Sequence, residues 1–199
     1  MEFRDVVRNR RSVRSYAPVI PMRELVDNIV DTARRAPSAG FSQGIDFLVL
    51  DEPDEMERFW RTTEDPTHGP QPGMAENRPP VVVLVFSDPG RYLARYSAGD
   101  KIEFGLDDLD RWPVRFWDVD AGMAAMQLQL AAVDAGLATW FFGIAYGEDA
   151  VRSHLGVPAD RKLCGIIALG YRNRDEVPSG SGTSRSRRPI AEQLHRNGW

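Results

Sequence analysis

The stretch WDVDAGMAAMQLQLAAVDA, residues 117–135, is the segment that decides the fold. Apolar residues fall on nearly every side of a helix drawn through it, and Gly136 follows as a natural C-terminal cap. A helix that is apolar all round is buried rather than set at the surface with one face in water. The stretch therefore predicts a long helix in the middle of the molecule, of the kind that is often buried between subunits.

Short apolar runs on both sides of this helix predict the strands of a sheet. These runs are Ile45–Leu50, Val81–Phe86, Ala138–Phe142 and Leu163–Leu169. Shorter helices are predicted over residues 2–10, from Pro21 to Pro37, over 53–62, from Pro89 to Tyr96 and near 148–155. No internal repeat is found, and we expect a single domain over residues 1–199.

Three segments lack the pattern of a helix or a strand. Residues 63–80 contain five prolines and two glycines, and residues 97–114 form an irregular acidic stretch. Loops of this length are usually functional, so we expect both to vary and to shape a substrate cleft. The tail, residues 172–199, has no core-forming periodicity but ends in Leu194 and Trp199. These apolar anchors predict that the tail docks on a second subunit.

The composition excludes several classes of protein. The 199 residues are 42% hydrophobic and 27% charged, and the net charge of −4 argues against a nucleic-acid or anionic-membrane surface. Cys164 is the only cysteine, so no internal disulfide can form and a reducing cytoplasm is the expected compartment. No apolar run follows Met1, and Gln127, Gln129 and Asp134 interrupt the longest apolar stretch. We therefore expect neither a signal peptide nor a membrane span.

Two arginine clusters lie at opposite ends of this acidic chain: Arg10-Arg11-Ser12-Val13-Arg14, and Arg185-Ser186-Arg187-Arg188. Each alone would suit a solvated helix end or tail. If the fold places the two clusters side by side, their positive charges repel each other unless an anion lies between them. Guanidinium groups match phosphate oxygens with paired donors, and a phosphomonoester carries about −1.5 to −2 charges at neutral pH. The two clusters therefore predict a phosphate-bearing ligand.

Several kinds of catalytic site are absent from the sequence. There is no phosphate-loop lysine motif, no Gly-x-Ser-x-Gly nucleophile elbow and no complete dinucleotide-binding glycine pattern. His68, His154 and His195 are isolated, without the paired spacing of zinc ligands, so no metal site is expected. These absences favour chemistry that is carried by a bound cofactor.

The order of short motifs along nearly the whole chain resembles the FMN-dependent nitroreductase family. The motifs are Arg10-Arg11-Ser12-Val13-Arg14, Ala36-Pro37-Ser38-Ala39-Gly40, Asp120-Ala121-Gly122, Ala135-Gly136-Leu137, Gly156-Val157-Pro158, Ala168-Leu169-Gly170-Tyr171 and Arg187-Arg188-Pro189. The resemblance implies an α+β fold with a central, mostly antiparallel sheet flanked by helices. It also implies an intertwined homodimer around the long central helix, with FMN bound in clefts between the subunits.

The resemblance implies a role for residues near both ends of the chain. Arg10 and Arg11 would hold the FMN phosphate, together with Arg185 or Arg187 from the tail. Ser12 would bond near the ribityl or pyrimidine side of the cofactor. Arg14 would lie at the pyrimidine edge, where its positive charge tunes the flavin by stabilising the reduced ring.

Two further groups of residues would approach FMN from other directions. Pro37, Ser38 and Ala39 are similar to the family loop that reaches the cofactor from the partner subunit. Backbone groups near Phe142 and Gly143 would lie on the N5 side of the flavin. No side chain is required as a catalytic acid or base, because solvent can supply protons.

The activity implied by the resemblance is a ping-pong oxidoreductase reaction. Hydride would pass from NAD(P)H through flavin N5 to a small electron-poor acceptor, such as a nitroaromatic or a quinone. Two alternatives stay open. A flavin-fragmenting enzyme like the dimethylbenzimidazole synthases is favoured by Phe41, which stands where the family usually has Asn, and is opposed by Ser12. A protein that only binds flavin or deazaflavin is the other.

Overall fold

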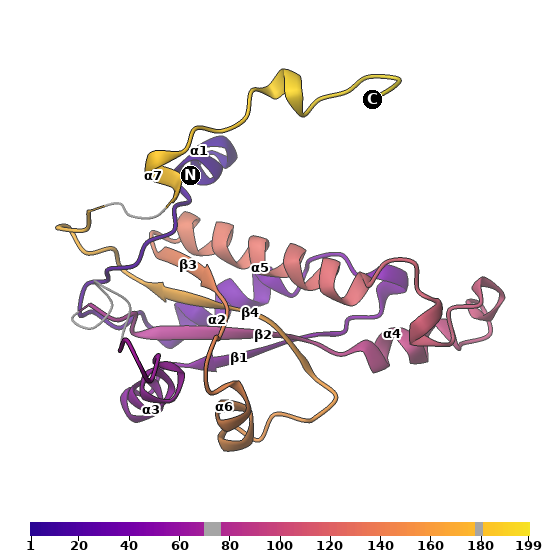
Figure 1. Ribbon diagram of the computed structural model, residues 1–199, viewed down its shortest axis with the longest axis horizontal. Coiled ribbons are helices and arrows are strands. Elements are labelled where there is room, and N and C mark those ends of the chain that lie inside the picture. Colours follow the sequence, from indigo (N-terminus) through magenta and orange to yellow (C-terminus); the bar gives the residue numbers. More distant parts are fainter. Residues whose placement is uncertain (70–76, 178–180) are drawn as a thin grey trace.

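The protein is built around one four-stranded antiparallel sheet with the strand order β1-β2-β4-β3 (Figure 1). The computed structural model describes residues 1–69, 77–177 and 181–199. The strands are β1 (Ile45–Leu50), β2 (Val81–Ser87), β3 (Ala138–Phe142) and β4 (Lys162–Gly170). All four were predicted from the sequence to within one residue at each end, and the expected α+β fold is confirmed.

Helices cover both faces of the sheet, which explains why the two central strands have no polar face. Every residue of β2 is buried, because the strand has a neighbour on each side and helices above and below. One face packs against α3 (Pro53–Thr63) and α6 (Glu148–His154). The other packs against α2 (Arg23–Ala33) and α5 (Phe116–Asp134), as Figure 1 shows.

The long helix α5 is buried on one side only. Ala121, Leu128 and Ala132 are fully buried against the sheet. On the opposite side Met123 and Met126 are exposed. The sequence therefore predicted the length and the apolar character of this helix correctly, but part of its apolar surface is exposed in a single chain.

The remaining elements surround this core. Helix α1 (Phe3–Asn9) packs on α5, and α4 (Pro89–Tyr96) follows β2. Residues 97–114 are not wholly irregular, since they contain two short 3-10 helices, Ile102–Phe104 and Leu109–Arg111. An aromatic cluster of Tyr92, Trp112 and Trp117 fixes this segment to α4 and α5.

The C-terminal tail extends away from the body of the chain. After the short helix α7 (Ser181–Ser184) it contains one 3-10 turn, Ile190–Glu192, and Figure 1 shows it projecting beyond α1. Ile190, Leu194 and Trp199 are all exposed. The predicted segments 63–80 and 172–199 lie partly outside the described residues. Within the described part of the chain, no helix is both long and apolar enough to cross a membrane.

Candidate cofactor site

The two arginine clusters meet at one pocket. Residues 12–17 pair first with β3 and then with the residue that follows β4. Val13 N donates to Thr139 O (2.9 Å), and Ala17 N donates to Tyr171 O (2.8 Å). A pocket of about 810 Å³, here called the basic pocket, opens beside this segment. Its polar lining consists of Arg8, Arg10, Arg11, Ser12, Arg14, Arg172, Glu176, Thr183 and Arg187.

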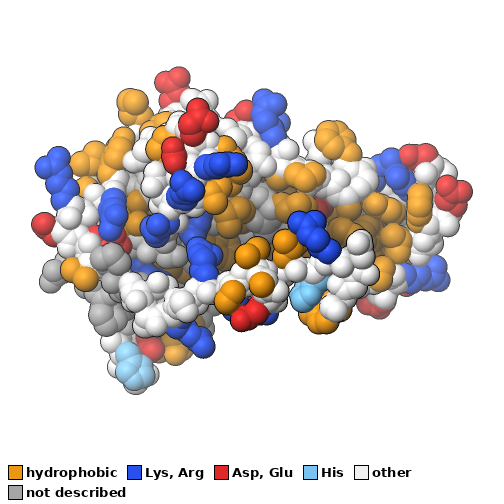
Figure 2. Space-filling model, turned by 90° about the horizontal axis from the view of Figure 1, so that it is seen from above, with side chains coloured by type: hydrophobic (Ala, Val, Ile, Leu, Met, Phe, Trp, Pro, Cys, Tyr) orange, Lys and Arg blue, Asp and Glu red, His pale blue; other side chains and the backbone are white. Residues whose placement is uncertain are grey.

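The basic pocket carries a large excess of positive charge. Among the described residues of the lining, six carry a guanidinium group and one carries a carboxylate. Glu176 is the buried partner: it accepts from Arg14 N (3.0 Å) and Arg172 Nε (2.7 Å). Figure 2, a view from the side of α1 and α7, shows basic side chains gathered on this face. Because like charges repel, such a pocket is suited to a multiply charged anion.

A second pocket, here called the aromatic pocket, lies at the far end of β3. It has a volume of about 380 Å³, and its lining includes Trp60, Trp140, Phe142, Gly143 and Tyr146. Flat apolar walls with a few polar groups are typical of sites for small planar ligands. The arrangement can therefore hold a ring system.

Arg78, Glu64 and Asp65 add charged side chains to the aromatic pocket, and His68 adds an imidazole ring. The carboxylate of Asp65 is already engaged: the backbone N–H of Thr67 donates to it (2.7 Å), and this bond lowers the pKa of Asp65 below its usual value. His68 also pairs with Asp65 (3.1 Å). The Asp65 carboxylate therefore stays ionised and bound to its own loop.

A column of stacked side chains connects the two pockets. The Cζ atom of Arg14, which lines the basic pocket, lies 5.2 Å from the ring centroid of Trp140. Trp140 is stacked on Phe142 at 4.3 Å between centroids, and Phe142 on Trp60 at 5.9 Å. Cation–π and stacking contacts of this kind hold the rings in fixed relative positions. The column places an anion pocket next to a ring pocket.

The loop Ser38–Gly44 is held rigidly at the N-terminal end of α5. Asp120, only 1% exposed, accepts from Ala39 N (2.9 Å) and from the hydroxyl of Tyr92 (2.8 Å). Burial, and then the bond to Asp120, raise the pKa of Tyr92 far above its usual value, so its hydroxyl stays a donor. Arg95 Nε donates to Gly40 O (2.9 Å). The loop is thus fixed by three buried or half-buried side chains.

This loop also stores backbone strain. Phe41 and Gln43 have φ values of 57° and 51°, in the left-handed region that side chains other than glycine rarely adopt. Gly40 also has a positive φ, and a Cβ there would lie 2.7 Å from the ring of Tyr96. The ring of Phe41 is 75% exposed. Strain of this kind persists where the surroundings impose it, and it is common at functional sites.

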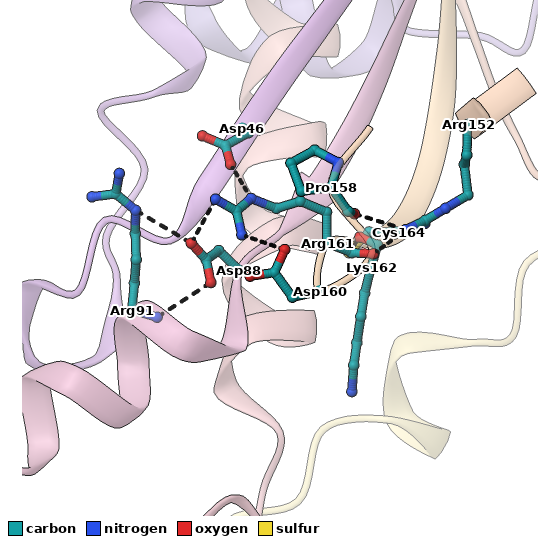
Figure 3. Close-up of polar contacts among 9 residues, drawn as sticks. All are labelled: Asp46, Asp88, Arg91, Arg152, Pro158, Asp160, Arg161, Lys162 and Cys164. Carbon is teal, nitrogen blue, oxygen red and sulfur yellow. Dashed lines mark hydrogen bonds and ion pairs between the residues drawn. The ribbon is translucent and has the colours of Figure 1, made fainter. Parts of the chain in front are cut away.

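An ion-pair network around the buried Asp88 holds α4, the helix that supports the loop (Figure 3). Asp88 caps the helix by accepting from Arg91 N (3.3 Å), and its carboxylate lies 3.0 Å from Arg161 Nη2. Arg161 also donates to Asp46 (2.9 Å) on β1, and Asp88 N donates to Gly44 O (2.8 Å). The network ties the start of β4 to β1 and α4, so the loop rests on the sheet.

The fold and these two pockets can be compared with known proteins. A sequence model of the Nitroreductase family matches residues 7–171. The chain belongs to the nitroreductase family. The match covers the first arginine cluster, the Ser38–Gly44 loop and the whole sheet.

Curated relatives of the chain support the same family. A protein of Archaeoglobus fulgidus that bears the name NADH dehydrogenase/NAD(P)H nitroreductase is 25% identical over 197 residues, which are 98% of this chain and 97% of the relative. YdjA of Escherichia coli K12, named as an NAD(P)H nitroreductase, is 27% identical over 179 residues, 85% of this chain and 88% of the relative.

Solved structures share the fold of this chain. An FMN-dependent nitroreductase of Clostridium difficile R20291 is 20% identical with a TM-score of 0.69, and the match covers 98% of each chain. A nitroreductase of Desulfovibrio desulfuricans, described in complex with FMN, is 23% identical with a TM-score of 0.71. That match covers 100% of this chain and 98% of the other. At these identities the likeness establishes the fold.

The structure brings together some of the predicted site residues and separates others. Those that line the basic pocket are Arg10, Arg11, Ser12, Arg14 and Arg187, and those that line the aromatic pocket are Phe142 and Gly143. Those that line neither pocket are Pro37, Ser38, Ala39 and Arg185. Of the two alternatives for the tail, the geometry therefore favours Arg187 over Arg185.

The sequence did not identify several other residues that line the two pockets. Arg172 and Glu176 belong to the basic pocket, and Trp60 and Arg78 to the aromatic pocket. Arg172 directly follows the motif that ends at Tyr171, which could have indicated it. Nothing in the local sequence distinguishes Trp60 from the other buried residues on the core face of α3.

We predict that Asp120→Ala destabilises the protein by about 2–4 kcal/mol, because it leaves two buried donors, Ala39 N–H and the Tyr92 hydroxyl, without an acceptor. Asp120→Asn should lose less, since an amide oxygen can still accept one of these bonds. Urea unfolding measures the difference. Asp107→Ala, which removes an exposed carboxylate that pairs with Arg111, is the control and should cost less than about 1 kcal/mol. Equal losses at the two positions would contradict the role given to Asp120.

Proposed function

We propose that this protein binds FMN, with the phosphate in the basic pocket and the flavin ring toward the aromatic pocket. The observation that carries the proposal is the contact between Arg14 and Trp140, which places the basic pocket beside the aromatic pocket. A ligand with a phosphate at one end and a planar ring at the other matches this pair. The solved relatives described with FMN add support.

The chain's own residues would bind and orient the cofactor. Arg10, Arg11 and Arg187 offer donors to the phosphate, and Ser12 to the ribityl or pyrimidine side. Phe142 and Gly143 line the aromatic pocket, and their backbone groups would lie on the N5 side of the ring. The donor set fits the group, because several guanidinium groups converge without an equal number of carboxylates.

The chemistry supplied by bound FMN is hydride transfer through N5, from NAD(P)H to an electron-poor acceptor such as a nitroaromatic or a quinone, in a ping-pong sequence. The protein contributes position and electrostatics. The guanidinium of Arg14 favours negative charge on the ring edge, so Arg14→Ala should make the flavin reduction potential more negative while FMN still binds. A loss of binding as large as the loss of reduction rate would count against this role.

A second copy of the chain would complete the site. The exposed apolar side of α5 carries Met123 and Met126, and a groove of about 620 Å³ runs between it and α1. The tail leaves the body of the chain with Ile190, Leu194 and Trp199 exposed. Removing these apolar surfaces from water favours association. We therefore propose a homodimer formed through α5, with each tail docked on the other subunit.

The dimer would also explain the position of the loop Ser38–Gly44. A two-fold axis through the middle of α5 pairs the helix antiparallel with its copy. The loop at the N-terminal end of α5 in one subunit would then face the C-terminal half of α5 in the second subunit. In each subunit, β3 and its pairing with Ser12 lie near that half of the helix. Pro37, Ser38 and Ala39 would thus reach the cofactor of the second subunit, although they line neither pocket of their own chain.

We predict that Met126→Asp converts a dimer of the 22.4 kDa chain into monomers, because pairing would bury a carboxylate without a partner. Sedimentation equilibrium of both proteins measures the change. Met22→Asp, at an exposed apolar position before α2, is the control and should leave the dimer intact. A wild-type protein that sediments as a single chain while FMN stays tightly bound would refute the shared site.

Arg187→Gln should weaken FMN binding about tenfold or more, because a charge-assisted bond to the phosphate contributes about 1.5–3 kcal/mol. Riboflavin, which lacks the phosphate, should bind equally well to wild type and variant. Fluorescence titration of the flavin-free protein measures both affinities. Arg185→Gln is the matched control, since Arg185 lies in the same tail but outside the pocket, and its effect should stay within about twofold. Equal effects at both positions would refute this assignment.

The visible spectrum of the purified protein tests the function itself. A flavin spectrum that bleaches after anaerobic addition of NADPH or NADH establishes the first half of the reaction. Consumption of FMN under oxygen would instead favour the flavin-fragmenting alternative, and a bound flavin that stays oxidised would favour a binding protein. No flavin, even after FMN is added, would refute the proposal.

A further inference from the structure

A carboxylate is built into the lining of the basic pocket. Glu176 is the one acidic residue among the described residues of that lining, and its side chain is only 6% exposed. A negative charge at a pocket for an anion repels the ligand, so its presence there needs a reason. A carboxylate beside arginines can also hold their side chains in one orientation through charge-assisted hydrogen bonds. The bonds that Glu176 makes favour this second role.

Glu176 is itself held in place by backbone bonds. Its Oε1 accepts from Arg14 N (3.0 Å), and its own N–H donates to Asn173 O (3.2 Å), which closes a turn just after β4. Asn173 is bonded twice to Ser15, through Asn173 N to Ser15 O (3.1 Å) and through Asn173 Nδ2 to Ser15 Oγ (3.1 Å). The turn is thus bonded to residues 14 and 15, which gives the carboxylate a fixed position.

The second oxygen of this carboxylate holds the guanidinium of Arg172. Glu176 Oε2 accepts from Arg172 Nε at 2.7 Å. A guanidinium has five N–H donors, so this bond leaves the donors on both Nη atoms for another acceptor. The side chain of Arg172 is 51% exposed and lines the basic pocket. An arginine with this exposure samples many rotamers when nothing holds it, and ordering it on binding costs entropy. The bond to Glu176 removes part of that cost before a ligand arrives.

We infer that Arg172 is a further anion-binding residue of the basic pocket, and that Glu176 is the positioning residue that holds its guanidinium. The group recognised is a phosphate, whose oxygens accept paired N–H donors from a guanidinium. Glu176 acts through Arg172 and does not contact the anion itself. The inference rests on the proposed function only in taking FMN as the molecule that carries this phosphate.

The direction of one change in affinity distinguishes positioning from repulsion. Glu176→Gln keeps the size of the side chain and one acceptor oxygen, but it removes the negative charge that holds Arg172. If Glu176 only repelled the anion, this variant would bind FMN more tightly. Because Glu176 positions Arg172, we expect FMN to bind about three- to tenfold more weakly. Riboflavin, which lacks the phosphate, should bind within about twofold of wild type, and fluorescence titration of the flavin-free protein measures both affinities.

A double-mutant cycle tests whether Glu176 acts through Arg172. Arg172→Gln should weaken FMN binding about tenfold. Adding Glu176→Gln to it should change the affinity by less than about twofold, because no guanidinium remains to be positioned. Arg172→Lys keeps the positive charge but lacks Nε, and a single ammonium group cannot bond the carboxylate and a phosphate in the same geometry. We therefore expect Arg172→Lys to bind FMN at least about threefold more weakly than wild type.

The same turn supplies a matched control for each charge. Arg174→Gln and Asp175→Asn remove one positive and one negative charge from exposed residues that lie outside the described lining of the pocket. Each should change the affinity for FMN by less than about twofold. Circular dichroism and thermal unfolding verify that every variant folds. If Glu176→Gln does not fold, the comparison of Arg172→Lys with wild type carries the test.

Each result decides the inference. Weaker FMN binding in Glu176→Gln, with riboflavin binding retained and no further loss in the double variant, supports it. FMN binding that is unchanged or tighter in Glu176→Gln, an equal loss for riboflavin, losses that multiply in the double variant, or full affinity in Arg172→Lys overturns it.

A wild-type protein that binds no FMN refutes the proposed function, and inorganic pyrophosphate then tests the pair separately. Calorimetric titration at low salt measures its binding to wild type, Glu176→Gln and Arg172→Gln. Weaker binding in both variants than in wild type supports the inference. Equal binding in all three proteins, or no binding to wild type, overturns it.

Discussion

The pairing of residues 12–17 with β3 and with the end of β4 is the constraint on which the site depends. It is made by few backbone bonds, Val13 N to Thr139 O and Ala17 N to Tyr171 O, across more than a hundred residues of sequence. Bringing distant segments together costs chain entropy, and here it also places arginines of like charge in one pocket. Two buried contacts offset this cost: the Tyr16 hydroxyl donates to Val13 O (2.7 Å), and Glu176 holds both Arg14 N and Arg172. Burial raises the pKa of Tyr16 far above its usual value, which keeps that hydroxyl a donor.

The stacked side chains Arg14, Trp140, Phe142 and Trp60 set the distance between the two pockets. Strand β3 presents Trp140 and Phe142 on the same face, because alternate residues of a strand share a face. Arg14 reaches the first ring from the paired segment, and Trp60 reaches the second from α3. The basic pocket and the aromatic pocket therefore cannot shift relative to each other unless this stack breaks. A site for a ligand with two unlike ends needs this property, because a small misplacement at either end weakens the other.

The sequence predicted the elements of this fold better than its contacts. Strands such as Val81–Ser87 were identified because a buried strand must be apolar on both faces, and α5 because nineteen residues of helical pattern admit no other reading. The arginine clusters indicated an anion by their charge alone. Trp60 and Arg78 could not be found in this way, because their place at the aromatic pocket is a property of the packed structure and leaves no trace in the local sequence. The positive φ at Phe41 is likewise invisible in the sequence, and so are the bonds that hold its loop, because Asp120 and Arg95 lie far along the chain from it.

Three exposed apolar features have no explanation within a single chain. The apolar side of α5, the projecting tail and the exposed ring of Phe41 all present hydrophobic area to water. The loop that carries Phe41 is nevertheless rigid: the Asp120 carboxylate and the Asp88 network hold it in a strained conformation instead of letting the ring fold back onto its own core. A rigid loop that displays an aromatic ring is preorganised for a contact outside its own chain, because the ordering entropy is already lost before binding. The proposed second copy would meet all three features at once. The strain at Phe41 would then be the cost of building each cofactor site from two chains.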